Sequence, residues 1–145
     1  SACAKQSQLQ FWTDFRNYLN LKDTSLSCRM PRGQHWYNFS IGSSIAHINT
    51  EVNTQKGFIS CGLYIPKNKG LFEFLKTKKD LIEDRFGKCK WVDAKVASRI
   101  LLIKESDEVI SVNVSKREEE FKWFYEKLVE FKKVFSPLIK EFLEK

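Results

Sequence analysis

The sequence predicts an α+β domain, in which an antiparallel sheet of about five strands packs against an N-terminal helix, a middle helix and a long C-terminal helix. Two patterns support this prediction. Apolar side chains recur at helical spacing near both ends of the chain. Between them, short segments of alternating apolar and polar residues are separated by turns that contain glycine. The 145 residues can bury one sizeable core, so we expect a single domain over residues 1–145.

The first helix is expected over residues 6–21. Its apolar side chains recur three or four residues apart and share one face: Leu9, Trp12, Phe15 and Leu19. An aromatic stripe at this spacing is more often part of a core than a ligand site. The polar residues at 23–25 are expected to end the helix.

Three strands are expected next, at residues 36–41, 46–54 and 58–65. Glycine-containing segments, Gly42-Ser43-Ser44 and Gln55-Lys56-Gly57, lie between them, where hairpin turns need residues that tolerate positive φ. Such short connections favour an antiparallel meander. In the second strand, alternation puts one set of side chains on each face: Ala46, Ile48, Thr50 and Val52 on one, and His47, Asn49 and Glu51 on the other.

A single middle helix is expected over residues 69–86, with Asn68 as its N-cap and Gly87 just past its end. Two further strands are expected at 90–92 and 98–104. Because residues 100–103 form a continuous apolar run, the later strand is expected to be central and covered on both faces. Residues 105–114 fit either an edge strand or a loop.

The C-terminal helix is expected to begin with a capping box formed by Ser115 and Glu118. Apolar residues then follow at helical period: Phe121, Phe124, Leu128, Phe131, Val134 and Phe135. Ser136-Pro137 indicates either a break or kink, or the first turn of a restarted helix, which proline tolerates.

The net charge of +7 and the pI near 9.2 favour nucleic acid or another anion as a partner. A lysine-rich solvated surface explains the same composition, since the excess is modest in every part of the chain and forms no basic run. The four cysteines are widely spaced and only two histidines are present, so we expect no zinc site and no other cofactor. We expect no membrane contact and a cytoplasmic location, because the sequence shows neither a membrane-length apolar run nor a signal-peptide pattern.

The candidate binding site combines three arginines with a histidine and a tryptophan: Arg29, Arg32, His35, Trp36 and Arg99. Arginine forks match phosphate oxygens, and Trp or His can stack on a base. The alternatives are structural. His35 could bond a backbone carbonyl, Trp36 could belong to the core, and Arg99 could pair with Glu51 across adjacent strands.

Catalytic patterns are sparse. Neither histidine lies in a nucleophile motif. Asp93-Ala94-Lys95, with Glu83 upstream, has the acid-x-lysine form of a metal-dependent nuclease, but such a tripeptide is common by chance. We therefore expect no catalytic and no metal-binding residues.

The order of features resembles domain-of-unknown-function family 4268 of bacteria and archaea. The resemblance depends on Phe11-Trp12 and Phe15, Pro31-Arg32, His35-Trp36, Ile41-Gly42, Phe86-Gly87, Ser98-Arg99-Ile100 and the aromatic last helix. It implies a C-terminal module, often beside a nuclease-like domain in restriction or defence proteins, with no assigned activity. The chain would then be a stand-alone member or one domain of a larger protein.

From these observations we expect a non-catalytic binding module that docks nucleic acid or an attached nuclease-like domain. Two alternatives remain: a divergent metal-dependent nuclease, and a purely structural protein-interaction or dimerisation domain. The sequence does not define the oligomeric state.

Overall fold

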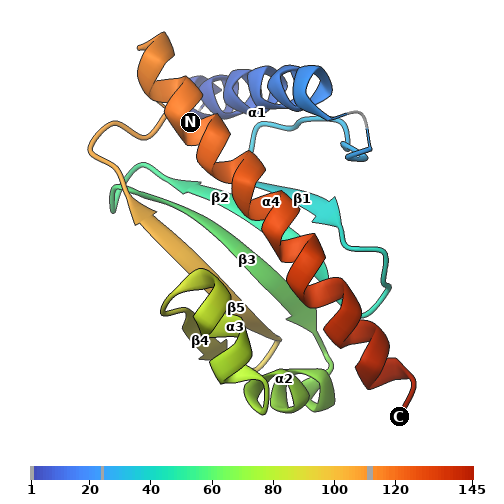
Figure 1. The fold of residues 1–145 in the computed structure, drawn as a ribbon. Coiled ribbons are helices and arrows are strands. Elements are labelled where there is room, and N and C mark those ends of the chain that lie inside the picture. Colours follow the sequence, from blue (N-terminus) through green and yellow to red (C-terminus); the bar gives the residue numbers. More distant parts are fainter. Residues whose placement is uncertain (1, 24, 111–112) are drawn as a thin grey trace.

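The computed structural model describes residues 2–23, 25–110 and 113–145, and it confirms an α+β fold built on a five-stranded antiparallel sheet (Figure 1). The strands follow the order β1-β2-β3-β5-β4. They are β1 (Trp36–Ser40), β2 (His47–Asn53), β3 (Phe58–Pro66), β4 (Lys90–Asp93) and β5 (Ala97–Glu105). The first three form the expected meander, and the two glycines in its turns, Gly42 and Gly57, have positive φ.

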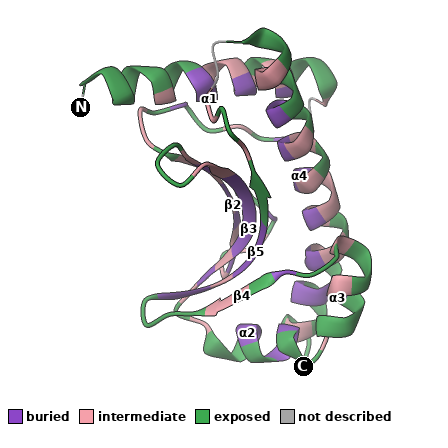
Figure 2. Cartoon of the chain, turned by 90° about the vertical axis from the view of Figure 1, so that its left-hand side faces the viewer, coloured by how far each residue is buried: buried purple, intermediate pink, exposed green. Residues whose placement is uncertain are grey.

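Within the described residues, four helices accompany the sheet: α1 (Ala2–Lys22), α2 (Lys69–Lys76), α3 (Lys79–Phe86) and α4 (Val114–Leu143). Together they cover one face only. In Figure 2 the sheet curves, and its concave face lies away from α4. That concave face, here called the open face, is the feature on which the site depends.

The covered face is packed with aromatic rings from α1 and α4. On α1, Trp12 and Phe15 are fully buried, and their ring centroids lie 5.4 Å from Tyr37 and 6.1 Å from Phe39 of β1. Phe124 of α4 lies 5.9 Å from Trp12. The predicted aromatic stripe of the first helix is therefore core, although Leu9 at its start is 42% exposed.

The expected middle helix is wrong as a single element, because the chain breaks at Thr77 and Lys78. Asn68 is the predicted N-cap and accepts from the backbone N–H of Leu71 at 2.9 Å. At the other end of α2, the Thr77 hydroxyl donates to the Phe74 carbonyl at 2.6 Å. The N–H of Lys78 then donates only three residues back, to Leu75. This tighter turn starts α3 in a new direction.

The predicted capping box of the last helix is wrong, and so is a break at Pro137. Its N-cap is Asn113, whose side chain accepts from the Lys116 N–H, so Ser115 lies inside the first turn and forms no capping box. The helix also continues through Pro137 without ending. Leu138 and Ile139 directly after it are buried, and their burial offsets the missing proline N–H.

The strand β5 is an interior strand, but it is not covered on both faces. Its Ile103 is 44% exposed on the open face. Leu101, on the same face, is buried because it fills the room that Gly62 leaves on β3; a Cβ added at Gly62 would lie 2.3 Å from Leu101 Cδ2. In the loop before α4, the described residues up to 110 form no strand, and residues 111–112 of the ambiguous segment lie outside the described residues.

The four cysteines are free, and Cys61 and Cys89 are buried as small apolar groups. Among the described residues, no helix combines the length and apolarity needed to cross a membrane.

Truncation of the aromatic residues between α1 and the sheet tests this packing. Trp12→Ala or Phe15→Ala should lower the free energy of unfolding by roughly 3–5 kcal/mol, because each removes a fully buried ring from a packed core. Denaturant titration measures the loss. Leu21→Ala is the matched control on the same helix, since Leu21 is 89% exposed and should change stability little. Losses below about 1 kcal/mol at both core sites would contradict this packing.

One carboxyl group, that of Glu120 on α4, is buried and only 3% exposed. Its oxygens accept no hydrogen bond of standard geometry from the described residues, although the backbone N–H of Ile110 lies close enough to favour the charged form. Burial raises the pKa of Glu120 from 4.5 to about 7, against the opposing effect of nearby lysines such as Lys116 and Lys104. The folded protein therefore holds a proton between pH 4.5 and 7 that the unfolded chain has released.

The sign of the resulting pH dependence is fixed by this raised pKa. The raised pKa of Glu120 adds to the free energy of unfolding. This addition is fully present below pH 4.5 and is lost as pH rises through about 7. Glu120→Gln removes the titration, so the variant should gain roughly 2–3 kcal/mol relative to wild type between pH 5 and pH 8. Denaturant unfolding at both pH values measures this gain, with exposed Glu119→Gln as control. An unchanged difference across the interval would refute the buried-carboxyl assignment.

Candidate functional site

The strand register aligns the open-face side chains into rows that run across the sheet. The first row pairs Trp36 with Glu51, then Ser60, then Ile103. The second contains Asn38, Asn49, Gly62, Leu101 and Lys90, and the third contains Ser40, His47, Tyr64, Arg99 and Val92. A hollow of about 430 Å³ extends over these rows, lined by His35, Trp36, Asn38, His47, Asn49, Glu51, Tyr64 and Arg99.

The third row combines a stacked ring pair with a cation. His47 and Tyr64 stack with ring centroids 4.9 Å apart and an interplanar angle of 22°. Arg99 lies next to Tyr64 in the register, and its guanidinium forms no ion pair or hydrogen bond with any described residue. Burial, and to a lesser degree the charge of Arg29, lower the pKa of His47, so this imidazole is neutral at pH 7. Each ring of the pair keeps one outer face, so a planar group can extend the stack beside the free cation of Arg99.

The second row presents amides. Asn49 Nδ2 donates to Asn38 Oδ1 at 2.7 Å across the two strands. This bond leaves the Asn38 amide NH₂ as a donor and Asn49 Oδ1 as an acceptor toward a ligand. Beside them, Gly62 and the overlying Leu101 make a low apolar floor.

The first row contains Trp36 and the acidic group of the site. Glu51 Oε2 lies 3.6 Å from His35 Nε2, and Glu51 Oε1 accepts from Ser60 Oγ at 3.2 Å. The predicted alternative of an Arg99–Glu51 ion pair is therefore wrong: the register places these residues in different rows. Trp36 is half-buried on the open face and is not part of the core, and the half-exposed His35 side chain faces Glu51 rather than a backbone carbonyl.

The segment before β1 is anchored from below by the core. The Trp12 indole donates to the Gln34 carbonyl at 2.7 Å, and the Tyr37 hydroxyl donates to the Arg29 carbonyl. Gly33 allows the close approach, since a Cβ there would lie 2.6 Å from the Lys5 carbonyl oxygen of α1. Arg29 and Arg32 are exposed on this anchored segment, where they line a second hollow that shares Trp36 and Asn38 with the first.

The structure thus brings His35, Trp36 and Arg99 together in one hollow and places Arg29 and Arg32 in the adjoining one. Sequence reasoning did not include five lining residues in the site: Asn38, His47, Asn49, Glu51 and Tyr64. The signal was present in the alternation of β2, which put His47, Asn49 and Glu51 on one face. The alternation does not predict, however, that this face is left uncovered by the helices.

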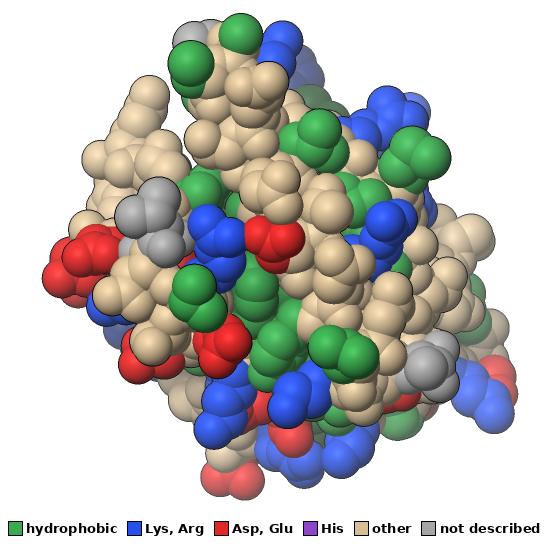
Figure 3. Space-filling view, turned by 90° about the horizontal axis from the view of Figure 1, so that it is seen from above, with side chains coloured by type: hydrophobic (Ala, Val, Ile, Leu, Met, Phe, Trp, Pro, Cys, Tyr) green, Lys and Arg blue, Asp and Glu red, His purple; other side chains and the backbone are tan. Residues whose placement is uncertain are grey.

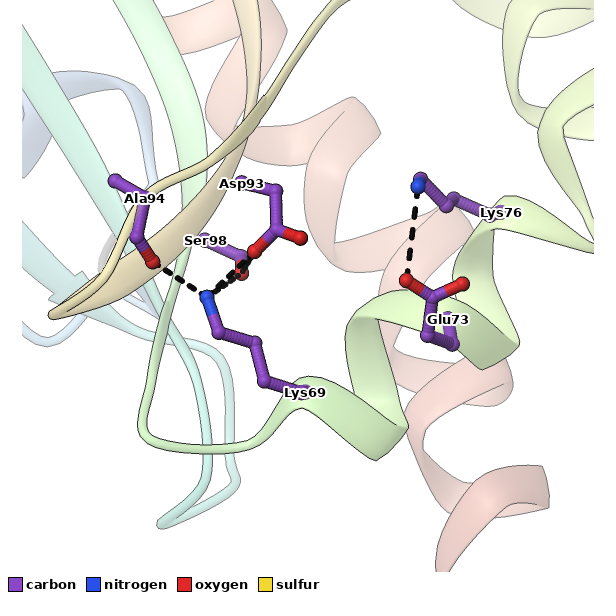
Figure 4. Close-up of polar contacts among 6 residues, drawn as sticks. All are labelled: Lys69, Glu73, Lys76, Asp93, Ala94 and Ser98. Atoms are coloured by element: carbon purple, nitrogen blue, oxygen red, sulfur yellow. Dashed lines mark hydrogen bonds and ion pairs between the residues drawn. The ribbon is translucent and has the colours of Figure 1, made fainter.

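Asp93 of the acid-x-lysine tripeptide forms structural contacts at the other end of the sheet. Lys69 Nζ lies 2.5 Å from Asp93 Oδ1 and also donates to the Ala94 carbonyl and to Ser98 Oγ (Figure 4). These bonds tie the start of α2 to the turn between β4 and β5. Ser98 is buried, so it is not available to attack a substrate.

Glu83 is also engaged, accepting from the Cys89 N–H and from the Trp91 indole. Within the described part of the chain, no three His, Cys, Asp or Glu residues group together in a way that could hold a metal ion.

The end of the molecule formed by α1 and the start of α4 carries charges of both signs. Figure 3 looks onto α1 and the beginning of α4, where acidic and basic side chains are interspersed with hydrophobic ones. Several of these charges neutralise each other, as in the pair Arg117–Asp14 at 2.7 Å. The open face, with its unpaired arginines, is the better anion-binding candidate.

The fold and this face together define an α+β domain with a solvent-facing, aromatic and arginine-bearing sheet. The family model described as Domain of unknown function (DUF4268) matches residues 7–139, so the chain belongs to this family. This match confirms the resemblance predicted from the sequence. Comparisons with curated proteins and with solved structures found no match.

The protonation state of the stacked histidine is directly testable. In an NMR titration, the His47 imidazole should titrate below 6.5, because burial and the Arg29 charge both disfavour its cation. Arg29→Gln should raise this pKa but leave it below 6.5, since burial is the larger cause. Lys140→Gln, which removes an exposed charge on α4, should leave it unchanged. A midpoint at or above 6.5 in the wild type would contradict the buried, stacked position of His47.

Proposed function

We propose that this domain is a non-catalytic module that binds single-stranded nucleic acid on the open face of its sheet. The observation that carries the proposal is the juxtaposition of the His47–Tyr64 stack and the unpaired Arg99, with Trp36 on the same hollow. Base–aromatic stacking is the main sequence-tolerant contribution to single-strand binding, and cations beside the rings hold the backbone.

The distribution of charge supports an anionic ligand. Arg99 lines the first hollow and Arg29 and Arg32 line the adjoining one, and none of the three forms an ion pair with a described residue. Glu51, the acidic residue that lines the first hollow, is already engaged by His35 and Ser60. Three arginines thus outnumber the one carboxylate that lines the two hollows, which favours a ligand that carries phosphates.

The shape of the face favours a single strand over a duplex. A concave sheet cannot enter a DNA groove, and duplex bases hide the ring faces that would stack on Trp36 or His47. A single strand can turn its bases toward the sheet and its phosphates toward the arginines at the rim.

In the setting that the family resemblance implies, such a module would hold nucleic acid near an attached nuclease-like domain of a restriction or defence protein. That role belongs in the bacterial or archaeal cytoplasm, where free cysteines such as Cys61 and Cys89 stay reduced. On this proposal the domain itself does not cut, so incubation of the chain with DNA or RNA and Mg²⁺ should leave both intact.

Salt-dependent binding tests the proposal. Fluorescence anisotropy with labelled 12-nucleotide single-stranded DNA, single-stranded RNA and duplex DNA should show binding to a single strand. About three phosphate contacts should give a log–log salt slope of roughly −2 to −3. Arg32→Ala and Arg99→Ala should each make the slope shallower by up to about one, because each removes one phosphate contact.

The matched control is Lys140→Ala, which removes one positive charge from the helical side of the molecule and should leave the slope unchanged. Circular dichroism confirms that each variant is folded. Absence of binding to every probe at low salt would overturn the proposal and favour docking of a protein domain on the same face. Equal loss in Lys140→Ala would show that binding reflects net charge alone.

A further inference from the structure

The three rows of the open face have a spacing that carries a more specific inference, which rests on the proposed function. Neighbouring rows are two residues apart along each strand, which corresponds to about 6.6 Å. Trp36 in the first row and His47 in the third are therefore separated by about 13 Å along the strand direction. Curvature of the sheet toward this face brings the side-chain tips somewhat closer.

The rows are farther apart than the bases of a stacked strand, and this difference decides which kind of strand can match them. Bases stacked in a duplex follow one another at about 3.4 Å, so one row step is about twice that rise. A strand whose bases stay stacked would not match the rows. A strand whose bases are separated and turned toward the sheet can place consecutive bases on consecutive rows.

We infer that the open face is a site for three consecutive nucleotides of a single strand. The first base stacks on Trp36, and the third stacks on the His47–Tyr64 pair. Both outer positions have a cation nearby: Arg32 in the hollow that shares Trp36, and Arg99 beside Tyr64. The two outer positions thus supply stacking and phosphate contacts, which do not depend on the base.

The middle position has a different chemistry. It lies over Gly62, where no side chain rises from β3 and Leu101 forms an apolar floor. The Asn38–Asn49 pair stands beside this floor and offers one donor and one acceptor after its internal bond is made. The middle base would therefore be held by its hydrogen-bonding edge, and this position is where base preference should arise.

The hydrogen bond between the Asn38 and Asn49 side chains holds both amides in fixed orientations. Because Asn49 Nδ2 is committed to Asn38 Oδ1, neither amide is free to rotate without losing a bond. A fixed donor and acceptor discriminate among bases better than freely rotating amides, because a mismatched base leaves a polar group unpaired. Affinity therefore depends on rows one and three, whereas base preference depends on row two.

A length series tests the three-nucleotide site. Unlabelled oligonucleotides of two, three, four and six nucleotides compete with a labelled 12-mer, in both DNA and RNA forms. Affinity should rise roughly 10-fold or more from two to three nucleotides, because only the trimer reaches both stacking rows. Longer oligonucleotides should then gain only gradually.

Single substitutions test which rows produce the rise in affinity from two to three nucleotides. Trp36→Ala should abolish the step from two to three nucleotides, and so should His47→Ala, which removes the platform at the other end. Asn49→Ala should keep the step but reduce the differences among trimers that vary only in the middle base. Ser44→Ala, at an exposed turn position outside the hollow, is the control and should change neither property.

The outcomes separate the two proposals. If no oligonucleotide of any length binds, the proposed function fails. If long single strands bind but affinity shows no step at three nucleotides, or if the step survives in both Trp36→Ala and His47→Ala, the three-nucleotide site is overturned while nucleic-acid binding stands.

Discussion

Aromatic packing of two helices against one face of the sheet is the constraint on which the rest of this structure depends. Trp12 and Phe15 of α1 and Phe124 of α4 fill the space above β1 and lie in contact with one another. Large rings bury much apolar area with little chain, so helices are needed on one side only. The other face of the sheet remains uncovered and can carry polar and aromatic side chains.

The same packing also positions the site. The indole N–H of Trp12 reaches past the core and holds the Gln34 carbonyl, and Tyr37 holds the carbonyl of Arg29. The segment that carries the arginines is thus fixed by the residues that stabilise the fold. A binding surface built this way needs little ordering when a ligand arrives, which lowers the entropic cost of association.

The sequence predicted which side chains of one strand share a face, but it did not predict which residues of distant strands join them in the site. Alternation in β2 assigned His47, Asn49 and Glu51 to one face, and the arginines were candidates because their forks match phosphate oxygens. Tyr64 and Arg99 belong to strands that are distant in sequence, and only pairing between β3 and β5 places them in one row. Local patterns carry no information about which distant strands pair, so the stack of His47 on Tyr64 could not be foreseen.

The sequence by itself determined the class of fold, the meander with its glycine turns, the aromatic core stripe of the first helix and the N-cap at Asn68, because these depend on neighbouring residues. Tertiary structure decided where helices end and which sheet face stays open. The unbroken helix through Pro137 follows from what the segment packs against, because burial of Leu138 and Ile139 outweighs the local preference of proline. The open face, and with it the site, exists because all four helices gather on one side of the sheet.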